Sequence, residues 1–179
     1  MTTETITLGG GCFWCTESVF VNVLGITDVE SGYSNGEVQQ PTYEQVCTGR
    51  TGHNEVVKLE YDPAQISLGE ILEIFFVIHD PTTPNRQGND VGTQYRSGIY
   101  YETPAQKQVA DDLVRQLNQD KLFGVPVVTE VQPRTNYWPA EEYHQAFFAN
   151  NPHQRYCMAV AAPKVAKFRK TFARLQKPA

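Results

Sequence analysis

A pair of cysteines near the start of the chain is the feature most able to do chemistry. Cys12 and Cys15 form a Cys-x-x-Cys motif directly after three glycines at residues 9–11. Residues 5–8 have the pattern of a strand and the motif is followed by helical apolar spacing, so we expect Cys12 at a strand–turn–helix junction. The free amides and the dipole at a helix start favour the thiolate form of cysteine. Cys12 is therefore a candidate nucleophile, although a free cysteine taken alone is more often a small buried apolar residue.

Two large aromatic residues, Phe13 and Trp14, separate the cysteines. Beside a glycine-rich turn they can form an exposed apolar slot around the sulfur of Cys12. Ordinary core packing explains the two rings equally well when they are taken alone. The motif is thus compatible with a pocket for an apolar group.

Other common signatures of cofactor and metal sites are missing from the sequence. Trp14 stands where the dinucleotide-binding fingerprint needs its third glycine, and no Gly-Lys-Ser/Thr of a phosphate loop is present. A structural zinc site needs further ligands at suitable spacing, and Cys47 and His53 do not supply that spacing. We therefore expect no nucleotide, no other cofactor and no metal.

Six separate segments of the chain resemble the A-type peptide methionine sulfoxide reductases. They occur in the order found in that family, and the likeness extends from about Leu8 to Cys157. Several unlinked segments are together far more specific than any one of them. The segments are residues 11–15 (GCFWC), 41–47 (PTYEQVC), 51–55 (TGHNE), 79–81 (HDP), 86–90 (RQGND) and 92–97 (GTQYRS).

The resemblance implies an enzyme that reduces the S epimer of free and peptide-bound methionine sulfoxide without a cofactor. Cys12 would attack the sulfoxide sulfur, while Phe13 and Trp14 would hold the methyl group of the substrate. The substrates would be oxidised proteins and free methionine sulfoxide, which makes this a repair enzyme for oxidative stress.

Four more residues have roles that the same resemblance implies. Departure of the sulfoxide oxygen requires its protonation, and Glu55 is the natural acid, because a carboxyl group in a partly apolar pocket has a raised pKa. Tyr43 and Tyr95 resemble the family tyrosines that hydrogen-bond the oxygen. Asp90 resembles the aspartate that supports this network. Without the resemblance, these residues would be interpreted as ordinary surface, packing and turn positions.

The reaction would leave Cys12 as a sulfenic acid, which condenses with a second thiol to a disulfide. Cys157 resembles the recycling cysteine of the family and is the favoured resolving residue, with Cys15, one helical turn from Cys12, as the alternative. Thioredoxin or a similar dithiol would reduce the disulfide. The best-known members have a flexible glycine-rich tail, whereas this chain has a basic helix from about residue 163.

Short strands and helices alternate along the chain. After the first strand, further strands are expected at residues 26–33, 55–61, 96–101 and 127–131. Helices are expected after Cys12, from Ser67 to His79, from Thr103, at 140–149 and from about 163. Ser67 and Thr103 each begin a capping-box pattern, and the long loop at 80–94 suggests a functional segment. The fold class is therefore α+β, a two-layer sandwich with helices packed on a mixed β-sheet.

The composition is that of one globular unit. The 179 residues are 40% hydrophobic and 20% charged, which suits a single domain spanning 1–179. The longest strongly apolar stretch, residues 71–78, is too short to cross a bilayer, and the first ten residues lack the pattern of a secretory signal. We therefore expect a cytoplasmic monomer whose cysteines are thiols.

Charge is unevenly distributed along the chain. The net charge is −5, yet residues 143–179 contain seven Lys and Arg and no Asp or Glu. A solvated face of the last helix is the favoured explanation, and neither nucleic acid nor a membrane is expected as a partner.

Two other classes of function remain open at this point. A helix-start cysteine with a histidine elsewhere is also the arrangement of papain-like cysteine hydrolases, although their local signature is missing. Alternatively, the aromatic residues belong to a peptide-binding module without activity. Reduction of a free methyl sulfoxide, without amide cleavage, would distinguish the reductase from both.

Overall fold

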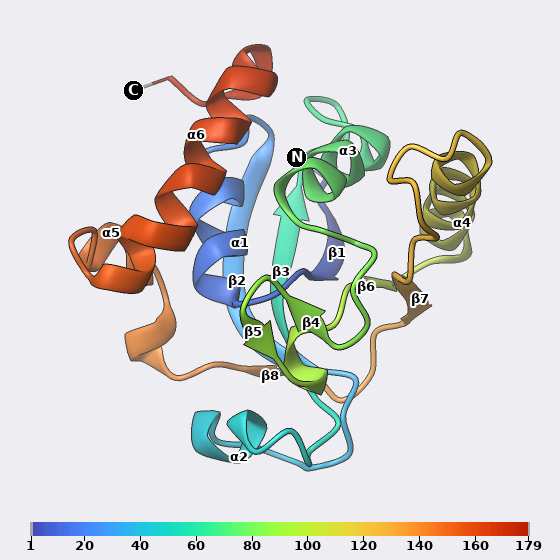
Figure 1. Ribbon diagram of the computed structural model, residues 1–179. Coiled ribbons are helices and arrows are strands. Elements are labelled where there is room, and N and C mark those ends of the chain that lie inside the picture. Colours follow the sequence, from blue (N-terminus) through green and yellow to red (C-terminus); the bar gives the residue numbers. More distant parts are fainter. Residues whose placement is uncertain (1, 179) are drawn as a thin grey trace.

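The computed structural model describes residues 2–178 and centres on a six-stranded sheet (Figure 1). Its strands are β1 (Glu4–Gly9), β2 (Ile26–Ser34), β3 (Asn54–Tyr61), β6 (Gly98–Tyr101), β7 (Glu130–Pro133) and β8 (Trp138–Pro139). They lie in the order β7-β6-β1-β3-β2-β8. Because β6 and β7 are parallel and all other neighbours are antiparallel, the sheet is mixed.

The larger helices form a layer on this sheet (Figure 1). They are α1 (Phe13–Phe20), α3 (Leu68–Ile78), α4 (Pro104–Gln119) and α6 (Ala162–Thr171). Helices α1 and α4 contact the strands directly, while α3 packs between α4 and α6, and α6 packs on α1. The expected α+β sandwich is confirmed. Within residues 2–178, the helices include none with the length and apolar character to span a bilayer.

The shorter elements, apart from η4, lie around the end of the sheet where β1 leads into α1 (Figure 1). They are α2 (Tyr43–Cys47), the hairpin β4 (Arg86–Gln87) and β5 (Asp90–Val91), α5 (Phe147–Asn150), the single turns η1 (Thr93–Tyr95), η2 (Glu142–His144) and η4 (Ala173–Leu175), and the π-helical η3 (Cys157–Ala161). The loop at 80–94 therefore contains the β4–β5 hairpin rather than only irregular chain.

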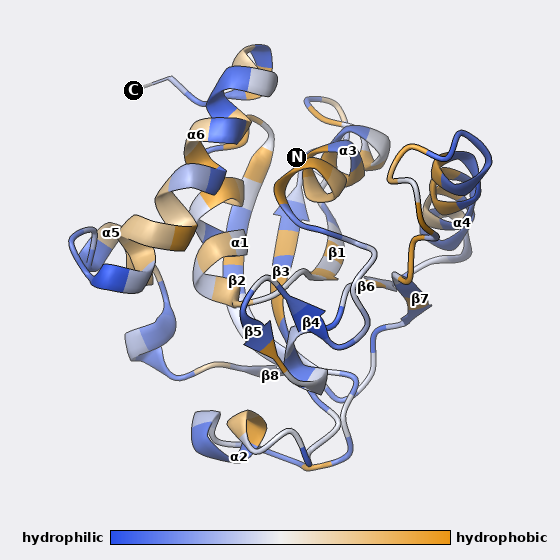
Figure 2. Cartoon of the chain, in the orientation of Figure 1, coloured by the Kyte–Doolittle hydropathy of each residue, from blue (hydrophilic) through white to orange (hydrophobic). Residues whose placement is uncertain are grey.

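One face of the central strands carries the core. Ile6 and Leu8 of β1 lie opposite Leu59 and Val57 of β3, and all four side chains are buried. Alternate residues of a strand point to the same side, so Glu55 shares the helix-covered face of β3 with Val57. Hydrophobic residues of β1, β3, α1 and α3 gather in this layer (Figure 2). The sheet thus directs a carboxyl group into apolar surroundings.

The capping patterns begin their helices where the sequence predicts. Ser67 and Glu70 form a complete capping box at α3. Thr103 caps α4 through the backbone N–H of Gln106, but the Gln106 side chain accepts from the N–H of Glu102 instead of completing a box. The capping-box prediction is therefore confirmed at α3 and wrong in its second half at α4.

Other boundaries differ from the sequence prediction. The strand expected at 96–101 begins at Gly98, and that expected at 127–131 runs over Glu130–Pro133. The helix expected at 140–149 is split into η2 and α5, because Ala146 between them is left-handed with φ 54°. The last helix ends at Thr171 and is followed by a separate turn, η4.

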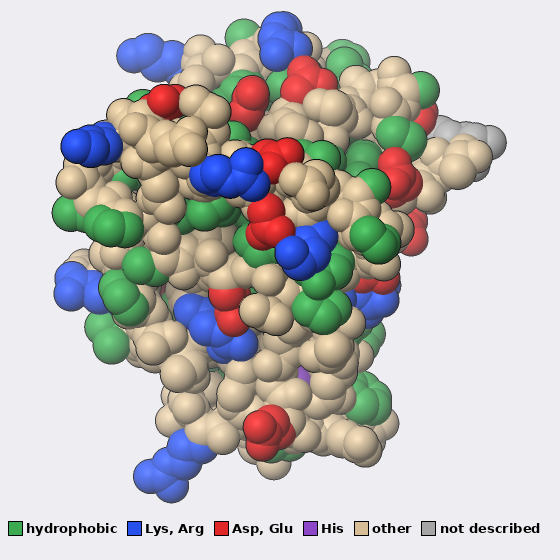
Figure 3. Space-filling model, turned by 90° about the vertical axis from the view of Figure 1, so that its right-hand side faces the viewer, with side chains coloured by type: hydrophobic (Ala, Val, Ile, Leu, Met, Phe, Trp, Pro, Cys, Tyr) green, Lys and Arg blue, Asp and Glu red, His purple; other side chains and the backbone are tan. Residues whose placement is uncertain are grey.

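The surface around α4 is charged with both signs. Acidic and basic side chains are interspersed with apolar ones on this side of the molecule (Figure 3). Along α4, Lys107 pairs with Asp111 at 2.7 Å and Arg115 with Asp112 at 2.8 Å. Exposed pairs of this kind add little to the stability of a helix, because water and salt screen the charges.

Candidate active site

The turn between β1 and α1 places Cys12 at the N-cap of the helix, directly before its first residue, Phe13. Gly11 has φ +91°, which other residues rarely adopt, and a Cβ atom on Gly9 would collide with the Asn54 side chain. These two glycines let β1 lie close against β3 and then turn sharply into α1. The backbone N–H of Cys15 donates to the Cys12 carbonyl at 3.1 Å. The predicted strand–turn–helix junction is confirmed.

Burial dominates the protonation of Cys12. Its side chain is 9% exposed, and its pKa is raised well above the usual value by burial, by a hydrogen bond to Cys15 and by the charge of Glu55. The expectation that the helix start favours a Cys12 thiolate is therefore wrong in this structure. The pKa of Cys15 is lowered instead, chiefly because Cys12 donates a hydrogen bond to its sulfur.

Glu55 is a buried carboxyl group with one free oxygen. Its Oε1 atom accepts from the Phe13 N–H at 3.2 Å, whereas Oε2 has no hydrogen-bond partner among residues 2–178. Burial raises its pKa to about 8; the Phe13 N–H opposes this shift, and the charges of Asp90 and Cys15 add to it. The group therefore keeps its proton at neutral pH, close to the thiol of Cys12.

Tyr43 and Tyr95 bring two phenol groups into the same region. Tyr43 is the first residue of α2, which Thr42 caps, and Tyr95 ends η1. Both side chains are half-buried, and the pKa of each is raised, first by burial and then by the charge of Glu55. Both hydroxyls consequently remain protonated and able to donate.

The aromatic pair beside Cys12 is covered. Phe13 is 1% exposed and lies against Tyr43 and His144. The indole N–H of Trp14 donates to Nδ1 of His144 at 3.0 Å, and its ring stacks on Phe147 with centroids 3.8 Å apart. The predicted exposed slot is therefore wrong for this structure, because side chains from the C-terminal part of the chain occupy its place.

Asp90 lies at the start of β5. It accepts a hydrogen bond of 2.5 Å from the hydroxyl of Tyr156, and the Cys15 thiol donates to the same hydroxyl at 3.7 Å. Tyr156 thus connects the β4–β5 hairpin with α1. Nothing in the sequence singles out this tyrosine apart from its position directly before Cys157.

The remaining two cysteines differ in environment. Cys157 is fully buried in η3, which packs against α1, and its pKa is raised by burial and by the charge of Cys15. Cys47 is exposed at the end of α2. All four cysteines, including Cys12 and Cys15, are free.

Three of the four histidines are buried and the fourth lies on the surface. His53 and His79 are buried and hydrogen-bonded to backbone carbonyls, while His153 is exposed. His144 is also buried, but its position over Phe13 and Trp14 makes it part of the site, which sequence reasoning missed.

Glu141 is a second residue of the site that the sequence did not indicate. Its carboxylate accepts from the backbone N–H of Tyr43 at 2.9 Å and from the hydroxyl of Tyr33 at 2.8 Å. These bonds attach the segment before η2 to α2 and β2.

Among residues 2–178, no cluster of three His, Cys, Asp or Glu side chains suits a metal ion.

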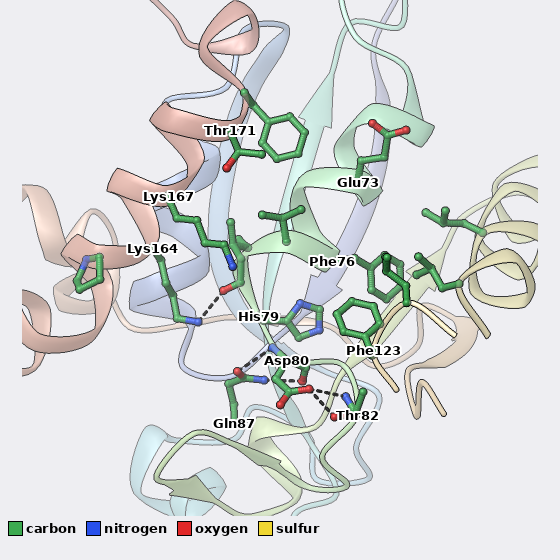
Figure 4. A pocket seen from close by; sticks show the side chains of 17 residues that line it. Glu73, Phe76, His79, Asp80, Thr82, Gln87, Phe123, Lys164, Lys167 and Thr171 are labelled. Carbon is green, nitrogen blue, oxygen red and sulfur yellow. Dashed lines mark hydrogen bonds between the residues drawn. The ribbon is translucent and has the colours of Figure 1, made fainter. Parts of the chain in front are cut away.

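A small cavity opens onto the cysteines, and a larger groove lies beside it. The cavity of about 170 Å³ is lined by Cys12, Cys15, Asp90 and Tyr156, among others. The groove of about 920 Å³, between α3, α4 and α6, is mainly apolar. Lys164 lines both spaces, and its ammonium donates to the carbonyl of Ile78 at 2.6 Å (Figure 4).

Comparisons with known proteins agree with this geometry. A family model described as "Peptide methionine sulfoxide reductase" matches residues 4–176. The peptide methionine sulfoxide reductase MsrA of Polynucleobacter asymbioticus is 52% identical over 177 residues, covering 99% of this chain and 93% of that protein.

Solved structures of similar proteins have the same fold. Methionine sulfoxide reductase A of Corynebacterium diphtheriae matches with a TM-score of 0.81 and 38% identity, covering 85% of this chain and 76% of that one. Saccharomyces cerevisiae Mxr1 in complex with Trx2 matches with a TM-score of 0.56 and 25% identity, covering 81% and 84%. The hydrolase and the binding module are thereby set aside: the chain belongs to the peptide methionine sulfoxide reductase family and is an oxidoreductase that reduces methionine sulfoxide.

Proposed function

We propose that this chain reduces the S epimer of free and peptide-bound methionine sulfoxide, with Cys12 as nucleophile and Glu55 as proton donor. The observation that carries these roles is the buried carboxyl group of Glu55, which has a pKa of about 8 and an unpartnered Oε2. A neutral acid beside a thiol is what sulfoxide reduction needs, because the oxygen leaves as a protonated group.

The reductase step would begin at the Cys12 sulfur. Its thiol is protonated in this structure, so attack on the sulfoxide sulfur requires that the thiol proton be passed on. Glu55 would give its own proton to the sulfoxide oxygen and take up the thiol proton in exchange, and the oxygen would pass as a hydroxyl from the substrate sulfur to the Cys12 sulfur. The step would yield methionine and a sulfenic acid on Cys12.

Tyr43, Tyr95 and Asp90 would support this step. The two hydroxyls remain protonated, so they can donate hydrogen bonds to an oxygen that gains negative charge. Asp90 would act less directly, since it holds the hydroxyl of Tyr156 over the cysteines.

Phe13 and Trp14 would hold the methyl group of the substrate once their covering side chains have moved. His144 and Phe147 occupy the faces that the methyl group would contact. Glu17 accepts the backbone N–H of Ala146 at 3.0 Å, and this bond ties the residue between the two covering segments to α1. Rotation at this residue is therefore the movement that we expect on binding.

A disulfide would then return the enzyme to its starting state, with Cys157 as the recycling cysteine and thioredoxin or a similar dithiol as reductant. The structure of Mxr1 with Trx2 supports this type of partner. Four free cysteines, one of them exposed, are also in keeping with a reducing compartment such as the cytoplasm.

The test is reduction of the two sulfoxide epimers of an amide-blocked methionine, with dithiothreitol as electron donor. We expect the S epimer to be consumed and the R epimer to remain, as measured by chiral chromatography. Equal rates for the two epimers, or amide cleavage in place of reduction, would refute the proposal.

A further inference from the structure

Gln87 lies beside the reacting groups, but the proposed function gives it no role. It belongs to β4 and pairs across the hairpin with Asp90 of β5. Its side chain is partly buried, and it lines the small cavity together with Cys12 as well as the larger groove. Gln87 is thus part of the wall between the two spaces.

The side-chain amide of Gln87 is bonded through both of its polar atoms to the backbone of one residue, Asp80 (Figure 4). Its Oε1 atom accepts from the N–H of Asp80 at 2.9 Å, and its Nε2 atom donates to the carbonyl of Asp80 at 2.9 Å. An amide carries an acceptor and a donor on one planar group, so it satisfies both backbone atoms at once. These two bonds connect β4 to the chain that leaves α3.

Asp80 is a firm point of attachment for this amide. It directly follows His79, whose buried ring is hydrogen-bonded to the carbonyl of Phe75 in α3 and, at 2.8 Å, to the hydroxyl of Ser97 before β6. The Asp80 carboxylate also accepts from the N–H of Thr82 at 3.0 Å. The residue that Gln87 binds is therefore held by α3 and by the edge of the sheet.

The aliphatic part of Gln87 lies against the turn that presents Cys12. A Cβ atom on Gly11 would be only 2.6 Å from the Cγ atom and 2.9 Å from the Cβ atom of Gln87. Such a close approach of a side chain to backbone is possible only because residue 11 is a glycine. One side chain thus contacts the residue before Cys12 and fixes β4 at the same time.

The hairpin that carries Asp90 needs this attachment. Its strands, β4 and β5, have two residues each, and a two-stranded hairpin is at best marginally stable by itself. Asp90 accepts a hydrogen bond of 2.5 Å from the hydroxyl of Tyr156, so the position of the hairpin decides whether this bond can form. The bonds from Gln87 to Asp80 anchor the strand opposite Asp90.

We propose that Gln87 is a positioning residue for the reductase step, because its amide holds the β4–β5 hairpin on Asp80 and thereby keeps Asp90 beside the turn of Cys12. This inference rests on the proposed function, in which Asp90 supports the reacting groups. Gln87 is not one of the residues proposed to hold the methyl group or the oxygen of the substrate. Its loss should therefore slow the chemical step without weakening substrate binding.

The first experiment measures methionine formation in a single turnover of the reduced full-length protein, at increasing concentrations of methionine sulfoxide. Gln87→Met keeps the length of the side chain and its contact with Gly11 but removes both bonds to Asp80. We expect the maximal rate to fall roughly 10- to 100-fold, the effect of a small displacement of a supporting group. The concentration that gives half of this rate should stay unchanged. So should the methionine formed per enzyme, which reports the folded fraction, because a variant that only unfolds more easily loses yield instead.

Two matched variants control for the type of substitution and for the loop. Gln116→Met removes the bond of another glutamine, to Asp120 on α4, far along the chain from the hairpin. Thr83→Val removes the bond from the Thr83 hydroxyl to the Arg86 carbonyl within the same loop. Both should keep the wild-type rate. An equal loss of rate in Thr83→Val and Gln87→Met would assign the effect to the loop as a whole and overturn the role of Gln87.

The second experiment repeats the comparison in an Asp90→Ala background. If Gln87 acts through Asp90, the two substitutions interrupt one chain of contacts, and their effects do not multiply. Gln87→Met should then slow Asp90→Ala by less than about twofold. A purely structural contribution of Gln87 would lower the rate by the same factor in both backgrounds.

Two further results would overturn the inference. One is a wild-type maximal rate in Gln87→Met, and the other is the same loss of rate with and without Asp90. The wild type reports the proposed function separately: if it forms no methionine, the proposed function itself fails. Methionine formed equally fast by the wild type and by Gln87→Met refutes only the role of Gln87.

Discussion

The site has two sides that are built in different ways. Its floor, residues 9–15 with residues 54–55, comes from the centre of the sheet and the start of α1. Its cover, residues 140–161, comes from the C-terminal part of the chain. The floor is fixed by strand pairing and close glycine packing, whereas the cover consists of short turns held by side-chain contacts.

The two regions shift the pKa values of their carboxyl groups in opposite directions, as Glu55 of the floor and Glu141 of the cover show. Glu55 of the floor has a single N–H donor and is fully buried, so its pKa is raised. Burial also raises the pKa of Glu141 in the cover, but the Tyr43 N–H and the Tyr33 hydroxyl more than offset this effect and the net shift is downward. Deeper burial and fewer hydrogen-bond donors, rather than proximity to the site, make Glu55 a proton-holding acid, whereas Glu141 stays ionised and anchors its segment.

The floor therefore supplies the reacting groups, and the cover controls the access of substrate to them. If this division is correct, substitutions in the floor stop or slow the reductase step. Substitutions in the cover change substrate binding and leave the chemical step intact.

The largest effect is expected for Cys12→Ser in the floor. A serine hydroxyl has almost no anionic form at neutral pH, so methionine formation should be lost with dithiothreitol as well as with thioredoxin. The measurement is methionine released per enzyme in a single turnover. Substantial residual release would remove Cys12 as the nucleophile.

Glu55→Gln should slow the reductase step by about 10³-fold, because glutamine keeps a hydrogen bond but supplies no proton. In the wild type the acid form is lost as pH rises through about 8, so the rate should fall on the alkaline side. That fall should be absent from the variant. A wild-type rate with an unchanged pH profile would exclude Glu55 as the acid.

The same substitution has a stability signature. The folded pKa of Glu55, about 8, exceeds its ordinary value of 4.5, so ionisation is disfavoured in the folded state. The free energy of unfolding should therefore decrease as pH rises from about 4.5 through 8, and Glu55→Gln should lack this component. Urea unfolding at several pH values measures it, with the wild type as reference.

Tyr43→Phe and Tyr95→Phe should each slow the step by about tenfold, the effect of one net hydrogen bond of about 1 kcal/mol, because the other donors still hold the oxygen. The double variant should be slower than either single one. Rapid-mixing measurement of methionine formation checks the order. A double variant as fast as the wild type would show that the hydroxyls do not contact the oxygen.

The smallest effect is expected in the cover, for Phe147→Ala. Its ring stacks on Trp14, and such contacts contribute about 1 kcal/mol. A substrate that must displace the ring should therefore bind roughly fivefold more tightly to the variant, with kcat for the chemical step retained. Val125→Ala, at an exposed apolar position outside both regions, is the control. An unchanged KM would show that the methyl group binds elsewhere.

The sequence by itself determined most of the fold and the reactive end of the site. Period-two and helical apolar patterns, with caps at Ser67 and Thr103, are local signals, so they predicted the strands and helices to within a few residues. The junction at Cys12 followed from the glycines next to it. The roles of Glu55, Tyr43 and Tyr95 came from resemblance of short segments, and these remain proposals.

Only the tertiary structure decided the protonation and the coverage of the site. Burial is a property of the packed chain, so the raised pKa values of Cys12 and Glu55 could not be read from a helix start or a strand position. The split at Ala146 and the placement of His144 over Trp14 depend on contacts more than 100 residues apart in sequence. Such contacts leave no local periodicity, because each is made by a single side chain whose partner is fixed only when the chain has folded.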